Sequence, residues 1–379
     1  MTRDASAHEH RLRSHADRGP DEFVFSAAAG VASPDGFRAA DLLLLEHVDP
    51  AADADVLVPA ANYGVVGTVL GALSPSGRTL LAETSARAAG LCERNLAAND
   101  VAGDVALEAT LPDATADTQF DVVAYAPRDY DPVDAVKQHI ADALAALRPG
   151  SDLYLAAHPR EGGKRYRDAL ADIAGGVDRI DKRAGVRLFR AERPATLPPT
   201  EYATFDEFTD SVAGDEFTFA TYPGVFSGGH VDHGTQLLAE TVDPDPEDTV
   251  LDLCCGYGPL GAVVADRGCE TWFTDDSAVA TACTRRTLDA NGLDGRVETA
   301  DCAAGLPADT FDLVVSNPPT HAGTSVLHEL FARASDVLQS GGEFLAVHHE
   351  ALDLPLDRAF SRVETVAHGE EHAVVRARN

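Results

Sequence analysis

The chain has 379 residues, of which 45% are hydrophobic, and this is enough for two domains that each bury a core. No apolar run approaches the roughly 20 residues that a membrane-spanning helix needs, and the first residues are polar, so we expect a cytoplasmic protein without membrane contact. Acidic residues outnumber basic ones by 62 to 30, which gives a net charge of −32. Because about 1 M salt screens charges beyond roughly 3 Å, this dispersed acidity is typical of a halophilic protein.

The cysteine and histidine spacings favour no metal site. The six cysteines show no Cys-x-x-Cys pattern, so neither a zinc site nor a disulfide framework is indicated. The pairs His230 with His233 and His348 with His349 have no third ligand at a suitable spacing. We therefore expect no metal cofactor.

Apolar strand-like runs alternate with alanine-rich stretches from Phe23 onward, which predicts parallel sheets covered by helices. Residues 1–18 are polar and are expected to form a mobile end. A proline-rich segment starting at residue 194 breaks the pattern, so we expect a linker over 194–212 between domains at 19–193 and 213–379. The expected strands lie at 56–58, 79–82, 105–107, 120–124, 153–157, 250–253, 270–274, 297–299, 311–315 and 344–348. The expected helices lie at 65–73, 85–99, 132–147, 165–174, 261–266, 277–291 and 326–338.

The two halves repeat one another, which indicates a duplicated domain. Segment 56–67 aligns with 250–261, 120–123 with 311–314, and 147–150 with 338–341, at nearly constant spacing. The first half has Val58, Asn62 and Ala126 where the second has Asp252, Gly256 and Asn317. We therefore expect the first copy to be degenerate and the second to carry the chemistry.

Four features of the second half follow successive expected strands, at the edge where open α/β sheets bind ligands. The first is VLDLCCGYGPLG at 250–261, a strand and tight glycine turn that would bring backbone N–H groups to a cofactor. An acid at Asp275 can accept both hydroxyls of a ribose, and Asp301 with the Cys302 N–H suits an adenine edge. Alternatively, both acids are ordinary turn residues. The expected cofactor-binding residues are Asp252, Cys254, Gly256, Tyr257, Gly258, Asp275, Asp301, Cys302 and Asn317.

The fourth feature is SNPPTH at 316–321, and with it the sequence resembles class I S-adenosylmethionine-dependent methyltransferases that carry Asn-Pro-Pro after the fourth strand. It is most similar to the duplicated-domain guanine-N2 methyltransferases of ribosomal RNA, of the small-subunit type. YPGVFS at 222–227 and DHGT at 232–235 contribute to this resemblance. It implies two tandem Rossmann-like α/β domains, S-adenosylmethionine as the cofactor, and a catalytic Asn317-Pro318-Pro319.

Asn-Pro-Pro suits an exocyclic amine, because the Asn317 side-chain oxygen and the Pro318 carbonyl can each accept one of its N–H groups. Two positions depart from the family pattern. Thr320 replaces the usual aromatic that stacks on the base, so stacking would fall to another residue such as His321 or Tyr257. Cys254 replaces the first glycine of the loop, which is tolerated if Cys254 keeps a negative φ. The expected substrate-binding residues are Thr320, His321 and Phe226.

The resemblance implies methylation of guanine N2 in small-subunit ribosomal RNA, free or in the assembled subunit, by a monomer. A protein glutamine amide or a small-molecule amine would suit the same tripeptide. A third reading is an RNA-binding pseudo-methyltransferase without activity. In the first copy, a basic cluster could meet RNA phosphates or form a solvated helix face: Arg160, Lys164, Arg165 and Arg167.

Overall fold

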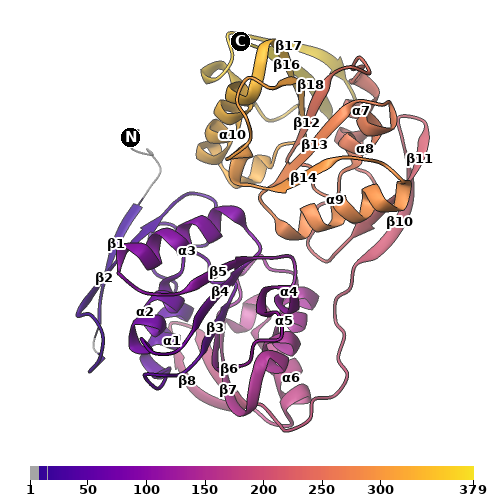
Figure 1. Cartoon of the computed structure of the whole chain (residues 1–379). Helices are drawn as coiled ribbons and strands as arrows, with labels where there is room; N and C mark the ends of the chain where they lie inside the picture. The colour runs from indigo at the N-terminus through magenta and orange to yellow at the C-terminus, as the bar shows by residue number, and fades with distance from the viewer. Residues whose placement is uncertain (1–7, 15) are drawn as a thin grey trace. The chain divides into compact units, whose positions relative to one another are not determined.

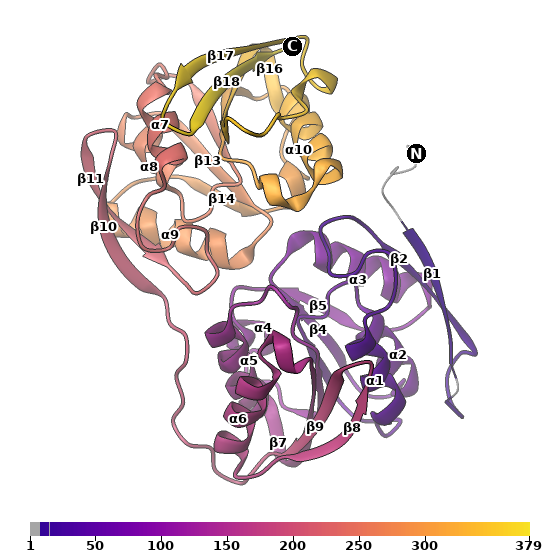
Figure 2. The ribbon, with the colours of Figure 1, turned by 180° about the vertical axis from the view of Figure 1, so that it is seen from behind.

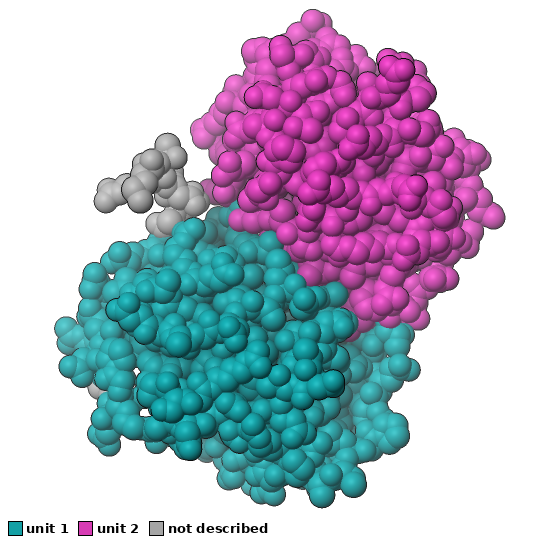
Figure 3. All heavy atoms as spheres, viewed as in Figure 1, with its two compact units in different colours: residues 1–204 teal, residues 205–379 magenta. Residues whose placement is uncertain are grey.

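A computed structural model describes residues 8–14 and 16–379. The chain divides into unit 1, residues 1–204, and unit 2, residues 205–379, which Figure 3 colours separately. Both units are seven-stranded α/β structures built on the same plan, which confirms the expected fold class.

The unit 1 sheet has the strand order β5-β4-β3-β6-β7-β9-β8, in which only the β7–β9 and β8–β9 pairs are antiparallel. Its strands are β3 (Val56–Pro59), β4 (Thr79–Glu83), β5 (Asp104–Leu107), β6 (Phe120–Tyr125), β7 (Leu147–Ala157), β8 (Asp178–Arg183) and β9 (Val186–Glu192). Its helices are α1 (Ala39–His47), α2 (Val65–Leu73), α3 (Ala86–Ala98), α4 (Leu111–Thr115), α5 (Val133–Ala146) and α6 (Gly163–Ala174), with a 3₁₀ turn at Pro159–Glu161.

Helices cover both faces of this sheet, so its central strands are buried on both sides (Figures 1 and 2). One core cluster joins the sheet to α1, α2 and α3, and a second joins it to α4, α5 and α6. Every residue of β3 and β4 is buried. This explains why these strands are continuous apolar runs rather than alternating ones.

The unit 2 sheet has the order β14-β13-β12-β15-β16-β18-β17, again with antiparallel pairing only where β18 meets its neighbours. Its strands are β12 (Thr249–Leu253), β13 (Glu270–Asp275), β14 (Arg296–Thr299), β15 (Phe311–Ser316), β16 (Leu338–His349), β17 (Arg362–His368) and β18 (His372–Arg378). Its helices are α7 (His233–Thr241), α8 (Pro259–Asp266), α9 (Ala278–Asn291) and α10 (Thr324–Val337), with 3₁₀ turns at Asp301–Ala303, Thr320–Ala322 and Leu356–Arg358. The parallel strands thus end at one edge, where the predicted site residues follow them.

Each unit begins with an antiparallel hairpin that belongs to the repeat. In unit 1 it is β1 (His8–Arg13) with β2 (Glu22–Ala27), and in unit 2 it is β10 (Asp206–Val212) with β11 (Asp215–Thr221). The Asn99 side chain accepts from Val24 N at 2.8 Å and donates to Val24 O at 2.7 Å. The Asn291 side chain makes the same two bonds with Thr218, at 2.9 and 2.7 Å. The two asparagines occupy equivalent positions, so the repeat includes the hairpins.

Because of these hairpins, the observed unit boundaries differ from the expected domain boundaries. Strand β1 lies within the segment 1–18 that was expected to be mobile, of which residues 1–7 and 15 lie outside the described part. Strand β10 lies within the expected linker 194–212, and the division between the units falls at 204/205 rather than at 212/213. Both strands are mostly polar, so their periodicity was weak.

Candidate active site

Four polar residues gather at the carboxyl edge of the unit 2 sheet because their strands are parallel neighbours. Asp252 lies in β12, Asp275 ends β13, Asp301 follows β14 and Asn317 follows β15. Ser277 is the N-cap of α9, since its side chain accepts from Ala280 N at 3.3 Å, and α9 therefore starts just after Asp275. The sheet therefore brings together the residues that the sequence placed at strand ends.

The glycine loop after β12 has left-handed backbone at three positions: Cys254 with φ 63°, Gly256 with φ 60° and Gly258 with φ 88°. The condition under which we expected Cys254 to be tolerated, a negative φ, is therefore not met. A non-glycine residue in this region carries a strain of about 1 to 2 kcal/mol. The backbone at Cys254 thus has the conformation that a glycine would adopt in this tight turn. Gly258 then leads into α8.

Asp252 is almost fully buried, with 1% of its surface exposed. Its Oδ2 accepts from Gly261 N at 2.8 Å, in the first turn of α8, while its Oδ1 meets no hydrogen-bond donor among the described residues. Burial raises the pKa of Asp252 to about 7, and the Gly261 N–H opposes this shift. A buried acceptor without a donor is costly, so this atom is poised to receive a cationic or N–H group from a ligand.

Asp275 fixes the other side of the loop. Its Oδ2 accepts from Gly256 N at 3.0 Å and its Oδ1 from Ser277 N at 2.9 Å. Burial raises its pKa to about 6, and both backbone N–H groups pull in the opposite direction. Each carboxylate oxygen has further lone pairs, so Asp275 can still accept two hydroxyl groups.

Asp301 and Cys302 form a 3₁₀ turn after β14, with Asp301 half-buried and Cys302 9% exposed. Cys302 has φ 46°, another left-handed non-glycine residue. Just before this turn, Ala300 N donates to Asp275 O at 2.9 Å, which continues the pairing of β14 with β13. Asp301 therefore lies one residue from a direct contact with the Asp275 backbone.

Asn317 is half-buried at the end of β15, and its amide nitrogen is held by α7. The Nδ2 donates to Thr235 Oγ1 at 3.0 Å and to Asp232 Oδ2 at 3.4 Å. No donor among the described residues reaches its Oδ1. Sequence reasoning used Asp232 and Thr235 only as part of a motif and missed this contact, although Asp at a helix N-cap three residues before Thr was a visible signal.

The residues after Asn317 form a tight turn. Thr320 N donates to the Pro318 carbonyl at 2.8 Å, and Ala322 N donates to the Pro319 carbonyl at 2.9 Å. The Pro318 carbonyl keeps one lone pair for a ligand. Thr320 is half-buried and His321 is exposed.

Tyr257 is 3% exposed and packs against the β10–β11 hairpin. Its ring packs against Phe208 and Phe219 of the hairpin, with centroids 5.5 and 5.4 Å away, and its hydroxyl donates to His230 O at 3.2 Å. This position removes the Tyr257 ring from the candidates for base stacking. Its backbone remains part of the glycine loop.

Phe226 is the most exposed large apolar side chain of the described residues, at 64%. Hydrogen bonds join the loop that carries Phe226 to Tyr257 of the glycine loop and to Asp210 of β10. The His230 carbonyl accepts from Ser227 Oγ at 2.7 Å as well as from Tyr257, and Val231 N donates to Asp210 at 2.8 Å. The loop then enters α7 at Asp232, so the chain that carries Phe226 continues directly into the contact with Asn317.

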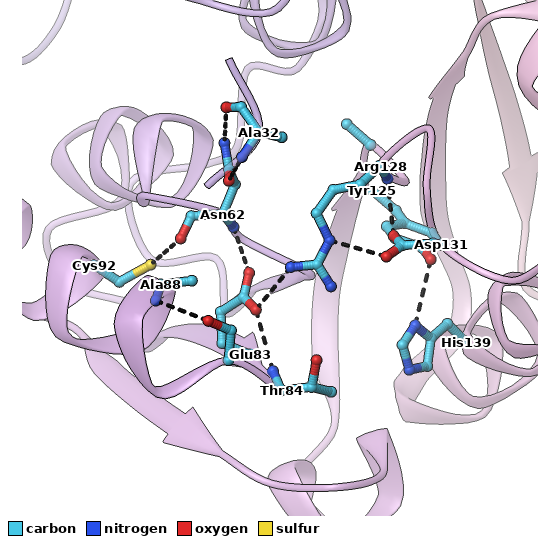
Figure 4. A network of polar contacts seen from close by, with 12 residues as sticks. Ala32, Asn62, Glu83, Thr84, Ala88, Cys92, Tyr125, Arg128, Asp131 and His139 are labelled. Atoms are coloured by element: carbon cyan, nitrogen blue, oxygen red, sulfur yellow. Dashed lines mark hydrogen bonds and ion pairs between the residues drawn. The ribbon is translucent and has the colours of Figure 1, made fainter. Parts of the chain in front are cut away.

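The same sheet edge in unit 1 carries an ion-pair network (Figure 4). Glu83, at the position of Asp275, is completely buried and accepts from Asn62 N, from Thr84 N at 3.1 Å and from Arg128 Nη1 at 3.2 Å. Arg128, at the position of Pro319, also pairs with Asp131 at 3.0 Å. The carboxylate at the position of Asp275 is thus used internally in unit 1.

Within the described ranges 8–14 and 16–379, no group of three or more His, Cys, Asp or Glu residues could hold a metal ion. In the same ranges, no helix has both the length and the apolar character that would let it cross a bilayer.

Comparison with known proteins identifies the family. The model of the methyltransferase small domain matches residues 22–190 and again 216–376, one match in each unit. The ribosomal RNA small subunit methyltransferase C of Pseudomonas paraeruginosa is 34% identical over 249 residues, which are 63% of this chain and 74% of that protein. The enzyme of the same name from Escherichia coli is 33% identical over 248 residues, which cover 63% and 70%.

A solved structure is similar over nearly the whole length. The 16S rRNA N2 guanine methyltransferase of T. thermophilus, in complex with AdoMet and guanosine, matches with a TM-score of 0.77 and 26% identity, covering 98% of both chains. This match spans both units, which confirms that the tandem fold is that of a two-domain methyltransferase. The chain therefore belongs to the methyltransferase small-domain family and, within it, to the type C methyltransferases of small-subunit ribosomal RNA.

Proposed function

We propose that this chain transfers a methyl group from S-adenosylmethionine to the N2 amine of a guanine in small-subunit ribosomal RNA. The observation that carries the proposal is the Asn317 amide, whose nitrogen is bound by α7 while its oxygen has no donor from the described residues. That oxygen is available for an N–H group of a substrate. The relatives named above act on ribosomal RNA, and the T. thermophilus structure contains a guanosine.

The residues at the sheet edge fit the cofactor. Asp252 Oδ1 is a buried acceptor that no donor of the described residues reaches, and it suits the cationic amino acid part of the cofactor. Asp275 retains lone pairs for two ribose hydroxyls, and Asp301 with the backbone of Cys302 would accept and donate at the adenine edge. Cys254, Gly256, Tyr257 and Gly258 would line the cofactor with their backbone. When bound, S-adenosylmethionine supplies an electrophilic methyl group on a sulfonium.

The protein's contribution to the chemistry is orientation. The N2 lone pair of guanine is delocalised into the ring, so the amine is a weak nucleophile. If Asn317 Oδ1 and the Pro318 carbonyl each accept one N–H, the lone pair turns toward the methyl donor for in-line attack. No strong base is required, because the nitrogen becomes acidic once it is methylated and can lose its proton to water.

The substrate side of the site would be formed by Phe226, Thr320 and His321. Because Thr320 has no ring, we assign base stacking to Phe226, which is exposed and carried by the anchored loop before α7. A guanine N2 amine is paired inside a helix, so the target guanine would be unpaired or flipped out.

Unit 1 would position RNA through a small basic surface. Arg160 and Arg165 are exposed near the start of α6, whereas Lys164 and Arg167 both pair with Asp168. In a chain of net charge −32, such contacts would need a high salt concentration to screen the surrounding acids. We propose a monomer, since each chain carries its own complete site.

Two measurements test this function. Methyl transfer in molar KCl is compared for deproteinised small-subunit ribosomal RNA, assembled subunits and a glutamine-containing release-factor protein. Transfer to the protein alone would contradict the RNA assignment. Asn317→Ala should leave S-adenosylmethionine affinity within about threefold and reduce turnover at least 100-fold, because orientation supplies most of the acceleration. Turnover retained in Asn317→Ala would contradict the mechanism, and absence of cofactor binding in calorimetry would contradict the enzyme itself.

A further inference from the structure

Two residues of α7 determine which way the Asn317 amide faces. Thr235, 3% exposed, lies with its Oγ1 3.0 Å from Asn317 Nδ2, and Asp232 Oδ2 lies 3.4 Å from the same nitrogen. The contact joins residues more than 80 positions apart, the start of α7 and the end of β15. It is therefore a tertiary contact made specifically at the proposed catalytic amide.

The direction of each proton in this cluster follows from chemistry. The Asp232 carboxylate only accepts, and it receives Gly234 N at 3.0 Å, Thr235 N at 3.2 Å and the Thr235 hydroxyl. Since the Thr235 proton points to Asp232, the lone pairs of Thr235 Oγ1 face Asn317 and can only accept from it. Two acceptors thus face the amide, and its NH₂ end must turn toward them.

We propose that Thr235, oriented by Asp232, is the positioning residue that holds the Asn317 side-chain oxygen toward the substrate amine. This inference rests on the proposed function and adds a residue to it. Without the two acceptors the amide could rotate by 180° and present its NH₂ group, a donor, to the N–H of the amine. A donor facing a donor cannot orient the amine's lone pair.

The degenerate copy carries an independent observation. Arg38, Asp41 and Ala126 of unit 1 occupy the positions of Asp232, Thr235 and Asn317. Arg38 donates to the Ala126 carbonyl at 3.1 Å and pairs with Asp41 at 2.9 Å. Unit 1 therefore keeps a contact between the start of the helix and the end of the strand, although it has none of the three unit 2 residues at these positions. The pair of acceptors occurs only in the copy that has the amide, so the architecture alone does not require it.

The test uses the full chain with three variants in molar KCl. Thr235→Val keeps the shape and removes the acceptor, Thr235→Ser keeps the hydroxyl, and Thr241→Val on the same helix is the matched control. Thr241 donates to Leu237 O at 2.7 Å within α7, which is unrelated to the site. For each variant, kcat and KM are measured with deproteinised small-subunit ribosomal RNA, S-adenosylmethionine affinity by calorimetry, and the melting temperature by calorimetric scan.

We expect Thr235→Val to lower kcat about 10- to 100-fold, because a misplaced reacting group typically costs this much. KM and cofactor affinity should stay within about threefold, and Thr235→Ser and Thr241→Val should retain kcat. Wild-type kcat in Thr235→Val would overturn the proposal, as would a kcat in Thr235→Ser as low as in Thr235→Val, which would indicate packing of the methyl group instead.

An NMR measurement tests the orientation of the Asn317 amide independently of the proposed function. The side-chain NH₂ signals of Asn317, assigned in ¹⁵N-labelled protein through Asn317→Ala, should exchange with solvent more slowly in wild type and Thr235→Ser than in Thr235→Val. Equal exchange rates in all three would overturn the orientation of the amide, whether or not ribosomal RNA is methylated. If slow exchange depends on Thr235 but wild type methylates no RNA, the proposed function fails while the orientation stands.

Discussion

Arg128→Ala should destabilise unit 1 strongly, because it leaves a buried carboxylate without its cation. The Arg128 side chain is 8% exposed and that of Glu83 is fully buried. Removing one partner of such a pair costs about 3 to 5 kcal/mol, since the remaining charge is neither hydrated nor paired. Among the described residues, Glu83 would then keep the N–H groups of Asn62 and Thr84 as its donors.

The size of the unit converts this cost into a melting temperature. For the 204 residues of unit 1, an unfolding entropy of roughly 2.1 cal/mol/K per residue gives about 0.4 kcal/mol/K. A loss of about 3 to 5 kcal/mol therefore lowers the transition of unit 1 by about 7 to 12 °C. Arg148→Ala is the control, because the arginine in its ion pairs with Asp55 and Asp121 is 41% exposed, and each such pair should contribute at most about 1 kcal/mol.

Salt and pH separate the buried pair from the exposed one. Calorimetric scans at 0.5 and 3 M KCl should leave the Arg128→Ala deficit in place and remove that of Arg148→Ala, because salt screens only exposed charges. Burial raises the pKa of Glu83 and Arg128 opposes this shift. Without Arg128 the folded unit therefore binds the Glu83 proton more tightly than the wild type does, so the deficit grows as the pH rises above the usual range of a carboxyl group. A shift under 3 °C, or a deficit that salt abolishes or that pH does not change, would refute the reasoning.

Three further changes test the unit 2 site. Burial raises the pKa of Asp252 to about 7, so binding of the cationic cofactor should release a proton from this carboxyl group. Cofactor affinity should therefore fall up to about tenfold for each pH unit below 7. Calorimetry in two buffers should detect the proton release for wild type and not for Asp252→Asn. Cys254→Gly should raise the free energy of unfolding by about 0.5 to 1 kcal/mol, because glycine adopts the φ of 63° without strain. A lower melting temperature of Cys254→Gly in a calorimetric scan would contradict the strain. Phe226→Ala should raise KM for RNA about tenfold with an unchanged melting temperature, since stacking on a base contributes about 1 to 3 kcal/mol, whereas Val363→Ala on the edge strand β17 should not; equal KM values would remove Phe226 from the site.

Strand ends were predictable because buried parallel strands are continuous apolar runs between helices. Asp252, Asp275, Asp301 and Asn317 could therefore be placed at one sheet edge from their order alone. The duplication was equally visible, since it keeps nearly constant spacing. What the sequence specified in each case was local periodicity, together with the rule that parallel strands end together.

Contacts between distant segments could not be predicted in this way. The hairpin β10–β11 is polar and was assigned in part to a linker, so nothing indicated that Phe208 would cover Tyr257 and remove it from the substrate side. The contact of Thr235 with Asn317 depends on where α7 packs, which spacing does not reveal. The positive φ of Cys254 was missed because the residue type argued against it, and only the backbone of the folded loop requires it.

The glycine loop has a counterpart that shows what determines its shape. Ala60, Asn62 and Gly64 of unit 1 have φ values of 48°, 60° and 85°, close to those of Cys254, Gly256 and Gly258. Unit 1 has this backbone although Arg128 there pairs with the carboxylate at the Asp275 position, so the conformation does not depend on a ligand. The loop of unit 2 is therefore preorganised, and little of the binding free energy is lost to ordering it when the cofactor arrives.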